Sequence, residues 1–154
     1  MEAVEELRYL VLAAQRDGSR RLAESLRPLG LTPAQSEVLT VLATSPGPLS
    51  VKELGELLVC ETGSPSRLAR SVVDAGWAEP VANERDGRVT RLGLTTRGQA
   101  IATQIAGVEH AFHEQLAATL GDPAALEGLV EALRCVVGEG PAGRALARRR
   151  ATAG

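Results

Sequence analysis

The chain has few aromatic residues and few cysteines. Tyr9, Trp77 and Phe112 are its only aromatic side chains among 154 residues, although 44% of the residues are hydrophobic. The interior must therefore be built from Leu, Val and Ala, which favours a mainly helical core. The two cysteines, Cys60 and Cys135, lie far apart in the sequence and imply no disulfide framework.

Long apolar runs and a strong net charge are also missing. No apolar segment approaches the roughly 18 residues that a transmembrane helix needs. The first residues, Met1 to Glu6, are acidic where a signal peptide would be basic. These features predict a cytoplasmic protein without a membrane partner. The net charge is −2, so any nucleic-acid binding must come from a local basic face.

Catalytic motifs are absent from the sequence as well. It contains no Gly-rich phosphate loop, no nucleophile motif and no pair of carboxylates in an acid–base arrangement. We therefore predict that the chain is not an enzyme and that it uses no cofactor.

Apolar residues at helical spacing dominate the rest of the chain. They predict helices over about residues 2–26, 33–44, 50–58, 66–75, 96–120 and 123–137. Ser50 and Glu53 form a capping box at the start of the third of these helices. Residues 77–81 and 89–94 alternate as two short strands, in which Pro80 requires an edge or bulge position.

The order helix, turn, helix and β-ribbon predicts a winged helix-turn-helix, in a fold that is mainly α with a small β-wing. Arginines at the tip of such a ribbon commonly enter a nucleic-acid groove, and the second helix of the motif lies in the major groove. The predicted DNA-binding residues are Ser64, Ser66, Arg67, Arg70, Arg85, Asp86, Arg88 and Arg91. The alternatives are salt bridges of Arg67 and Arg70 to nearby carboxylates, and simple helix capping by the two serines.

The first helix and the last two lie outside this module, and each has an apolar stripe. Because one protomer can hardly bury all three stripes, we expect a homodimer, whose paired reading helices would meet successive major grooves. The predicted organisation is an N-terminal dimerisation arm at 1–30, a winged helix-turn-helix module at 31–97, dimerisation helices at 98–140 and a basic flexible tail at 141–154.

With these motifs in place, the chain resembles the MarR family of bacterial transcription regulators. The resemblance rests on the segments Leu31–Gln35, Glu53–Leu58, Ser66–Leu68, Ala75–Trp77, Asp86–Arg88 and Leu94–Gly98, taken in that order. It implies a homodimer that binds a pseudo-palindromic operator in double-stranded DNA, with Arg88 in the minor groove and Asp86 holding the wing arginines. It also implies a repressor that a small-molecule effector, bound beside the dimer helices, releases from DNA.

Other functions remain open at this stage. Cys60 precedes the recognition helix, where helix amides can lower a thiol pKa, so a redox-sensing regulator is one alternative; it requires that a Cys60→Ser variant lose oxidant-induced DNA release. A winged-helix adaptor that binds protein instead of DNA is another. His110 and His113 are three residues apart, but no further ligand accompanies them and zinc generally takes four. We therefore predict no metal site.

Overall fold

A computed structural model of the chain describes residues 1–59, 64–82 and 90–152. The fold is mainly helical with one small antiparallel sheet, as the sequence predicts. Its elements are α1 (Ala3–Leu26), the 3-10 helix η1 (Arg27–Leu29), α2 (Pro33–Thr44), β1 (Leu49–Ser50), α3 (Val51–Gly55), α4 (Pro65–Asp74), β2 (Ala78–Val81), β3 (Arg91–Leu94), α5 (Thr96–Leu120), α6 (Pro123–Val137) and α7 (Pro141–Thr152).

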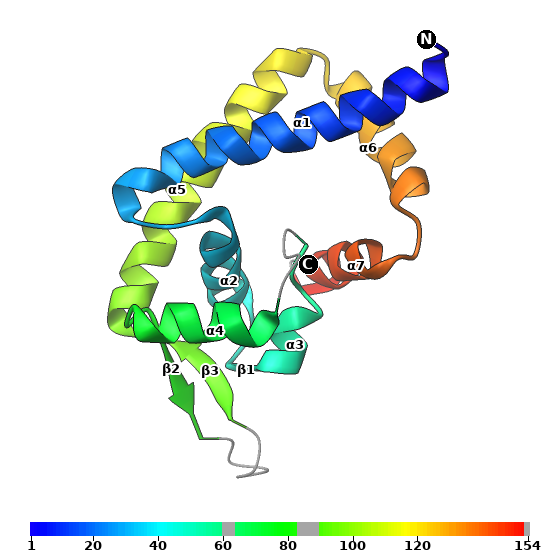
Figure 1. Ribbon diagram of the computed structural model, residues 1–154. Coiled ribbons are helices and arrows are strands. Elements are labelled where there is room, and N and C mark those ends of the chain that lie inside the picture. The colour runs from blue at the N-terminus through cyan, green and yellow to red at the C-terminus, as the bar shows by residue number, and fades with distance from the viewer. Residues whose placement is uncertain (60–63, 83–89, 153–154) are drawn as a thin grey trace.

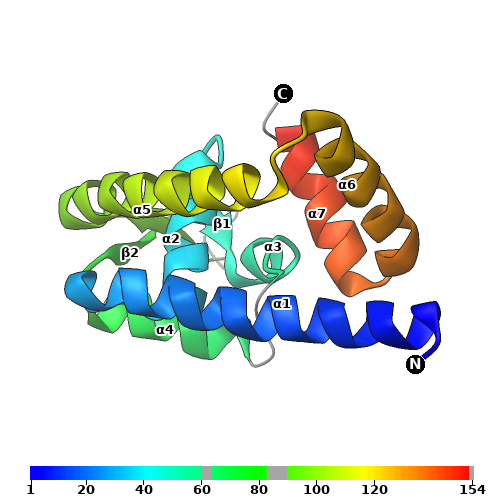
Figure 2. The ribbon, with the colours of Figure 1, turned by 90° about the horizontal axis from the view of Figure 1, so that it is seen from above.

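The helices and strands divide between two ends of the molecule. The reading module, which comprises α2, α3, α4 and the sheet, lies at one end, and α1 crosses the other end (Figure 1). The long helix α5 joins the two ends and contacts both α1 and α2. Both views place α7 between α6 and α3, so the chain returns to the reading module after α6 (Figures 1 and 2).

Side-chain caps fix where the helices of the reading module begin. Thr32 with Gln35 and Ser50 with Glu53 both form complete capping boxes. The Glu53 carboxylate accepts the Ser50 backbone N–H at 2.7 Å. This hydrogen bond, together with one from the Ser50 side chain and the charge of Arg91, lowers the pKa of Glu53. Each box satisfies helix amides that have no partner within the helix.

The sheet has the strand order β1-β3-β2, with both neighbouring pairs antiparallel. Leu92 at the centre pairs with Leu49 on one side and with Pro80 on the other. Pro80 thus lies on an edge strand, where its missing N–H leaves no gap in the ladder, as the sequence predicts. The two strands β2 and β3 extend away from the helices as the base of a wing (Figure 1).

The hydrophobic core lies within the reading module and reaches the helices that flank it. Its most completely buried apolar side chains are Leu26, Leu39, Leu54, Ile105, Val38 and Val72. Leu26 comes from the end of α1 and Ile105 from the N-terminal half of α5. Both long helices are therefore anchored in the module by one end.

The C-terminal segment differs from the sequence-based prediction. Residues 141–152 form helix α7 in place of the flexible basic tail that we expected from 141 onward. Arg149 pairs with Glu37 of α2 at 2.7 Å, and Arg148 pairs with Glu56 at 2.8 Å. Ala145 is buried. A run of arginines by itself indicates a solvated tail. Here two of them, Arg148 and Arg149, have carboxylate partners that are distant in the sequence.

Helix α5 begins in close contact with the turn that follows α4. The Thr95 N–H donates to the Trp77 carbonyl at 3.1 Å, and the Thr95 hydroxyl donates to the Gly76 carbonyl at 2.8 Å. The Thr95 oxygen also accepts the Gly98 N–H as a helix cap. A Cβ added at Gly98 would overlap the Trp77 carbonyl. Glycine at this position therefore permits the contact between α5 and the end of α4.

We expect Gly98→Ala to destabilise the protein by about 1–3 kcal/mol, because the new methyl group forces backbone apart in a packed region. The change is measured as a lower midpoint of urea unfolding. Gly107→Ala is the matched control on the same helix, since no atom lies within 4 Å of its added Cβ; it should keep or raise stability. Equal midpoints for Gly98→Ala and the parent would show that the close approach is unimportant.

Candidate nucleic-acid interface

Helix α4 presents a polar outer face and an apolar inner face. Ala69 and Val72 are buried in the core, whereas Ser66, Arg67 and Arg70 are exposed. This division follows from the spacing of the apolar residues, which places them one helical turn apart. The predicted DNA-binding residues of this helix therefore share its accessible side.

The exposed arginines of α4 have no intramolecular partner among the described residues. Neither the Arg67 side chain nor the Arg70 side chain forms a hydrogen bond or an ion pair there, so the salt-bridge alternative finds no support in that part of the chain. Ser64 is the N-cap residue of α4, but its side chain makes no capping hydrogen bond. Its hydroxyl is exposed and is not engaged as a cap.

Helix α2 holds α4 from behind. The Gln35 side chain, which also completes the α2 capping box, donates to the Ser71 hydroxyl at 3.3 Å. That hydroxyl donates in turn to the Leu68 carbonyl within α4. The polar contact fixes the rotation of α4 about its axis, and with it the direction in which Arg67 and Arg70 point.

The sequence assigns three of the predicted DNA-binding residues to the turn between the two wing strands. Arg85, Asp86 and Arg88 lie outside the described residues, and Cys60 does also. The described strands β2 and β3 lie on the same side of the module as α4 (Figure 1). The roles of these three residues stay predictions from the sequence.

Arg91 is placed differently from the arginines of α4. Its guanidinium donates to the Pro48 carbonyl at 2.7 Å and to the Glu53 carboxylate at 3.1 Å. These bonds tie β3 to the chain on either side of β1. An arginine that is already bound twice favours a structural role at the base of the wing, and DNA contact by Arg91 stays a prediction.

Behind the interface, polar groups from three helices meet. Glu37 of α2 is only 7% exposed and accepts both the Val59 N–H and the Arg149 side chain. On α5, Glu109 accepts a hydrogen bond from Thr40 at 3.3 Å. Burial raises the pKa of Glu109, and the nearby charge of Glu37 raises it further. The hydrogen bond from Thr40 and the charges of His113 and Arg149 lower this pKa but do not outweigh the burial.

Motifs in the sequence do not mark these polar residues as a cluster. One signal was present: Glu37 lies within the apolar stripe of α2, between Ala34 and Val38 and one turn before Val41. A carboxylate at such a position must find a partner when it is buried. Arg97 was also missed; it donates to the Ala75 carbonyl at the end of α4.

The remaining sequence-based expectations concern single residues and the membrane. His110 pairs with Glu114 at 3.4 Å, and no three His, Cys, Asp or Glu side chains of the described residues come together as a metal site would require. Cys135 is an exposed free cysteine on α6. Among the described helices, none is both long and apolar enough to cross a membrane.

Comparison with known proteins identifies relatives of this arrangement. Residues 29–89 match the model of the MarR family. The multiple antibiotic resistance protein MarR of Escherichia coli is 35% identical over 85 residues, which span 55% of this chain and 58% of the relative. The HTH-type transcriptional repressor Rv2887 of Mycobacterium tuberculosis is 32% identical over 102 residues, or 66% of this chain and 73% of the relative.

Solved structures of E. coli MarR are similar over nearly the whole fold. A mutant MarR complexed with operator DNA has a TM-score of 0.77 at 28% identity, covering 90% of this chain and 100% of that chain. Wild-type MarR in its apo form has a TM-score of 0.67 at 29% identity, covering 86% of this chain and 97% of that chain. The arrangement described here is thus more similar to the DNA complex than to the apo form.

The raised pKa of Glu109 predicts a pH dependence of stability. A carboxyl whose pKa is higher in the folded state stabilises the fold when it is protonated. Its contribution to the free energy of unfolding is therefore lost as the pH rises from the ordinary pKa of 4.5 through the folded pKa. Because glutamine does not ionise, the Glu109→Gln variant should become more stable relative to the parent as the pH rises through this range. Urea midpoints of both proteins between about pH 4 and pH 7 measure the difference, and parallel curves would contradict the prediction.

Proposed function

Because this chain belongs to the MarR family, whose members are transcriptional regulators, we propose that it is a dimeric repressor in the bacterial cytoplasm that binds a pseudo-palindromic operator. In this proposal α4 enters the major groove with Ser64, Ser66, Arg67 and Arg70. The wing enters the minor groove with Arg88, which Asp86 holds in place, and Arg85 and Arg91 add contacts there.

The observation that carries the proposal is the accessible basic face of α4. Arg67 and Arg70 are exposed, and no carboxylate of the described residues neutralises them. Arginine guanidinium groups can form paired hydrogen bonds with guanine or bind phosphate. The greater similarity to operator-bound MarR than to apo MarR supports a module that is already arranged for DNA.

Dimerisation is supported by apolar side chains that the protomer leaves exposed. They lie on α1 (Val4, Leu7, Leu10, Val11, Leu12), on the C-terminal part of α5 (Leu116) and on α6 (Leu129, Val130, Val136, Val137). All belong to the segments 1–30 and 98–140 that the sequence marked for dimerisation. A second protomer would remove this surface from water, and symmetric pairing would set two α4 helices for one operator.

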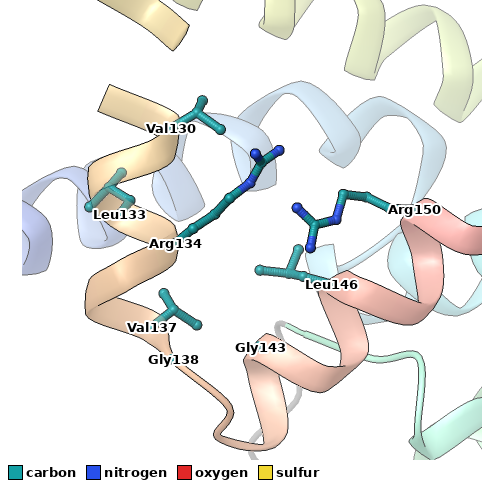
Figure 3. A pocket seen from close by; sticks show the side chains of 8 residues that line it. All are labelled: Val130, Leu133, Arg134, Val137, Gly138, Gly143, Leu146 and Arg150. Carbon is teal, nitrogen blue, oxygen red and sulfur yellow. The ribbon is translucent and has the colours of Figure 1, made fainter. Parts of the chain in front are cut away.

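Regulation by an effector is supported by two cavities beside α7. One, of about 340 Å³, lies between α6 and α7 and has Val130, Leu133 and Leu146 in its lining (Figure 3). The other, of about 610 Å³, lies between α7 and the reading module, at Leu58, Val59 and Pro65. Both are in the size range of small-molecule sites. A ligand can release the protein from DNA only if it binds more tightly to a conformation in which the spacing of the two reading modules does not fit the operator.

We expect Arg67→Ala and Arg88→Ala each to weaken operator binding about tenfold or more, or about 1.4 kcal/mol, because each removes a groove contact. Fluorescence anisotropy with operator and with unrelated DNA measures the loss. Arg20→Ala is the control: it removes the same charge from α1, the helix that crosses the opposite end of the molecule from α4 (Figure 1). Affinity equal to the parent in both test variants would contradict the assigned roles.

A salt titration separates this proposal from the adaptor alternative. Operator affinity should fall steeply with added salt, with a slope of about −0.9 per neutralised phosphate in a double-logarithmic plot. A winged-helix adaptor would show no operator affinity at any salt concentration. The redox alternative depends on Cys60, and no described contact favours it over effector release.

The dimer makes its own prediction. Leu10 is 59% and Val136 64% exposed in the protomer, so glutamate at either position should leave the fold of the protomer intact. Because charge is poorly tolerated at a buried apolar interface, Leu10→Glu with Val136→Glu should convert the dimer to a monomer and greatly weaken operator binding. Sedimentation equilibrium measures the mass; a parent that is monomeric at micromolar concentration would refute the dimer.

A further inference from the structure

Helix α7 is held on the reading module by charged side chains more than by apolar contact. Of the residues of α7 whose burial is described, only Ala145 is buried. The Arg148–Glu56 pair is largely exposed on both sides, and such pairs contribute little. The Arg149–Glu37 pair differs because Glu37 is 7% exposed. A buried carboxylate that loses its cation is strongly unfavourable, so of the two ion pairs described this one costs more to break.

The same carboxylate also fixes the backbone just ahead of the recognition helix. Glu37 Oε1 accepts the Arg149 guanidinium at 2.7 Å and the Val59 N–H at 2.8 Å. Val59 precedes Ser64, the N-cap of α4, by five residues. One oxygen atom therefore links the C-terminal helix with the segment that leads into α4.

At its other end α7 is bound to the side of the molecule that we assign to dimerisation. It contacts α6, and Gly143 allows the close turn, because a Cβ there would overlap the Gly138 carbonyl. Helix α7 thus connects α6 to the reading module on the side away from the α5 junction (Figure 1).

We infer that Glu37 and Arg149 are positioning residues for operator recognition: their ion pair lets α7 hold the reading module at the spacing from α6 that fits DNA. This inference rests on the proposed operator binding. The arrangement with α7 attached is the one that has the TM-score of 0.77 with operator-bound MarR, against 0.67 with apo MarR. Breaking the pair frees the module to adopt other spacings, and specific binding weakens because the competent state is less populated.

The test compares full-length Arg149→Gln, Glu37→Gln and the double variant. Each single variant should lower operator affinity about tenfold, and the double variant should be no worse, because both changes remove one interaction. Affinity for unrelated DNA and the dimer mass should stay unchanged. Arg149→Lys, which keeps the charge, should recover part of the affinity. Hydrogen exchange at the Val59 amide and in residues 141–152 should be faster in both single variants.

Arg150→Gln is the matched control, since the Arg150 side chain forms no hydrogen bond or ion pair with the described residues. Its operator affinity should match the parent's. The inference would be overturned if Arg149→Gln and Arg150→Gln lost equal affinity for both operator and unrelated DNA while Glu37→Gln lost none. Arg149 would then contact phosphate directly. Lower thermal stability with unchanged operator affinity would overturn it as well. If the parent protein has no operator affinity, the proposed function is refuted. The hydrogen-exchange rates would still show whether Glu37 joins α7 to Val59.

Discussion

The contact between the end of α4 and the start of α5 sets the geometry on which DNA binding depends. α4 and the wing are the two predicted reading elements, and the wing strands leave from Trp77 and return at Thr95. The hydrogen bond between these two residues closes the wing at its base, and Gly98 lets α5 approach closely enough to form it. The orientation of the wing relative to α4 is therefore fixed by backbone contacts, which do not vary with side-chain rotamers.

The two ends of α5 have different surroundings, and this difference explains the division of the molecule. Ala102 and Ile105 near its N-terminus are buried with the reading module, whereas Leu116 near its C-terminus is exposed. The reading module is thus a finished structure with its own core, while α1, α6 and the far half of α5 lack a cover for their apolar faces. Because α5 contacts helices of both parts, a change in packing around its far half in the proposed dimer would alter the position of α4.

Local signals predicted the elements, and contacts between distant segments escaped prediction. Apolar spacing gave the limits of α2 and α5, the Ser50–Glu53 capping box gave the start of α3, and Pro80 predicted an edge or bulge position, because these signals act over a few residues. The end of α3 was predicted wrongly, since the helix expected over 50–58 ends at Gly55. Helix α7 was not predicted, since its arginines indicate a solvated tail until Glu37 and Glu56 are known to lie beside them. The exposed face of α4 could be predicted from the spacing of its apolar residues. The contact of Arg91 with Glu53 could not be predicted, because it depends on the register in which β3 pairs with β1.

Five arginines of the described residues show two different kinds of surroundings. Arg91, Arg97 and Arg149 are bound to carboxylates or carbonyls of distant segments and hold elements together. Arg67 and Arg70 have no such partner among the described residues. Charge that is already paired within the fold contributes less to an outward-facing basic surface, so the total charge says little about where such a surface lies. A chain with a net charge of −2 can therefore present a basic face on α4, because Arg91 and Arg149 are paired with carboxylates whereas Arg67 and Arg70 are not, among the described residues.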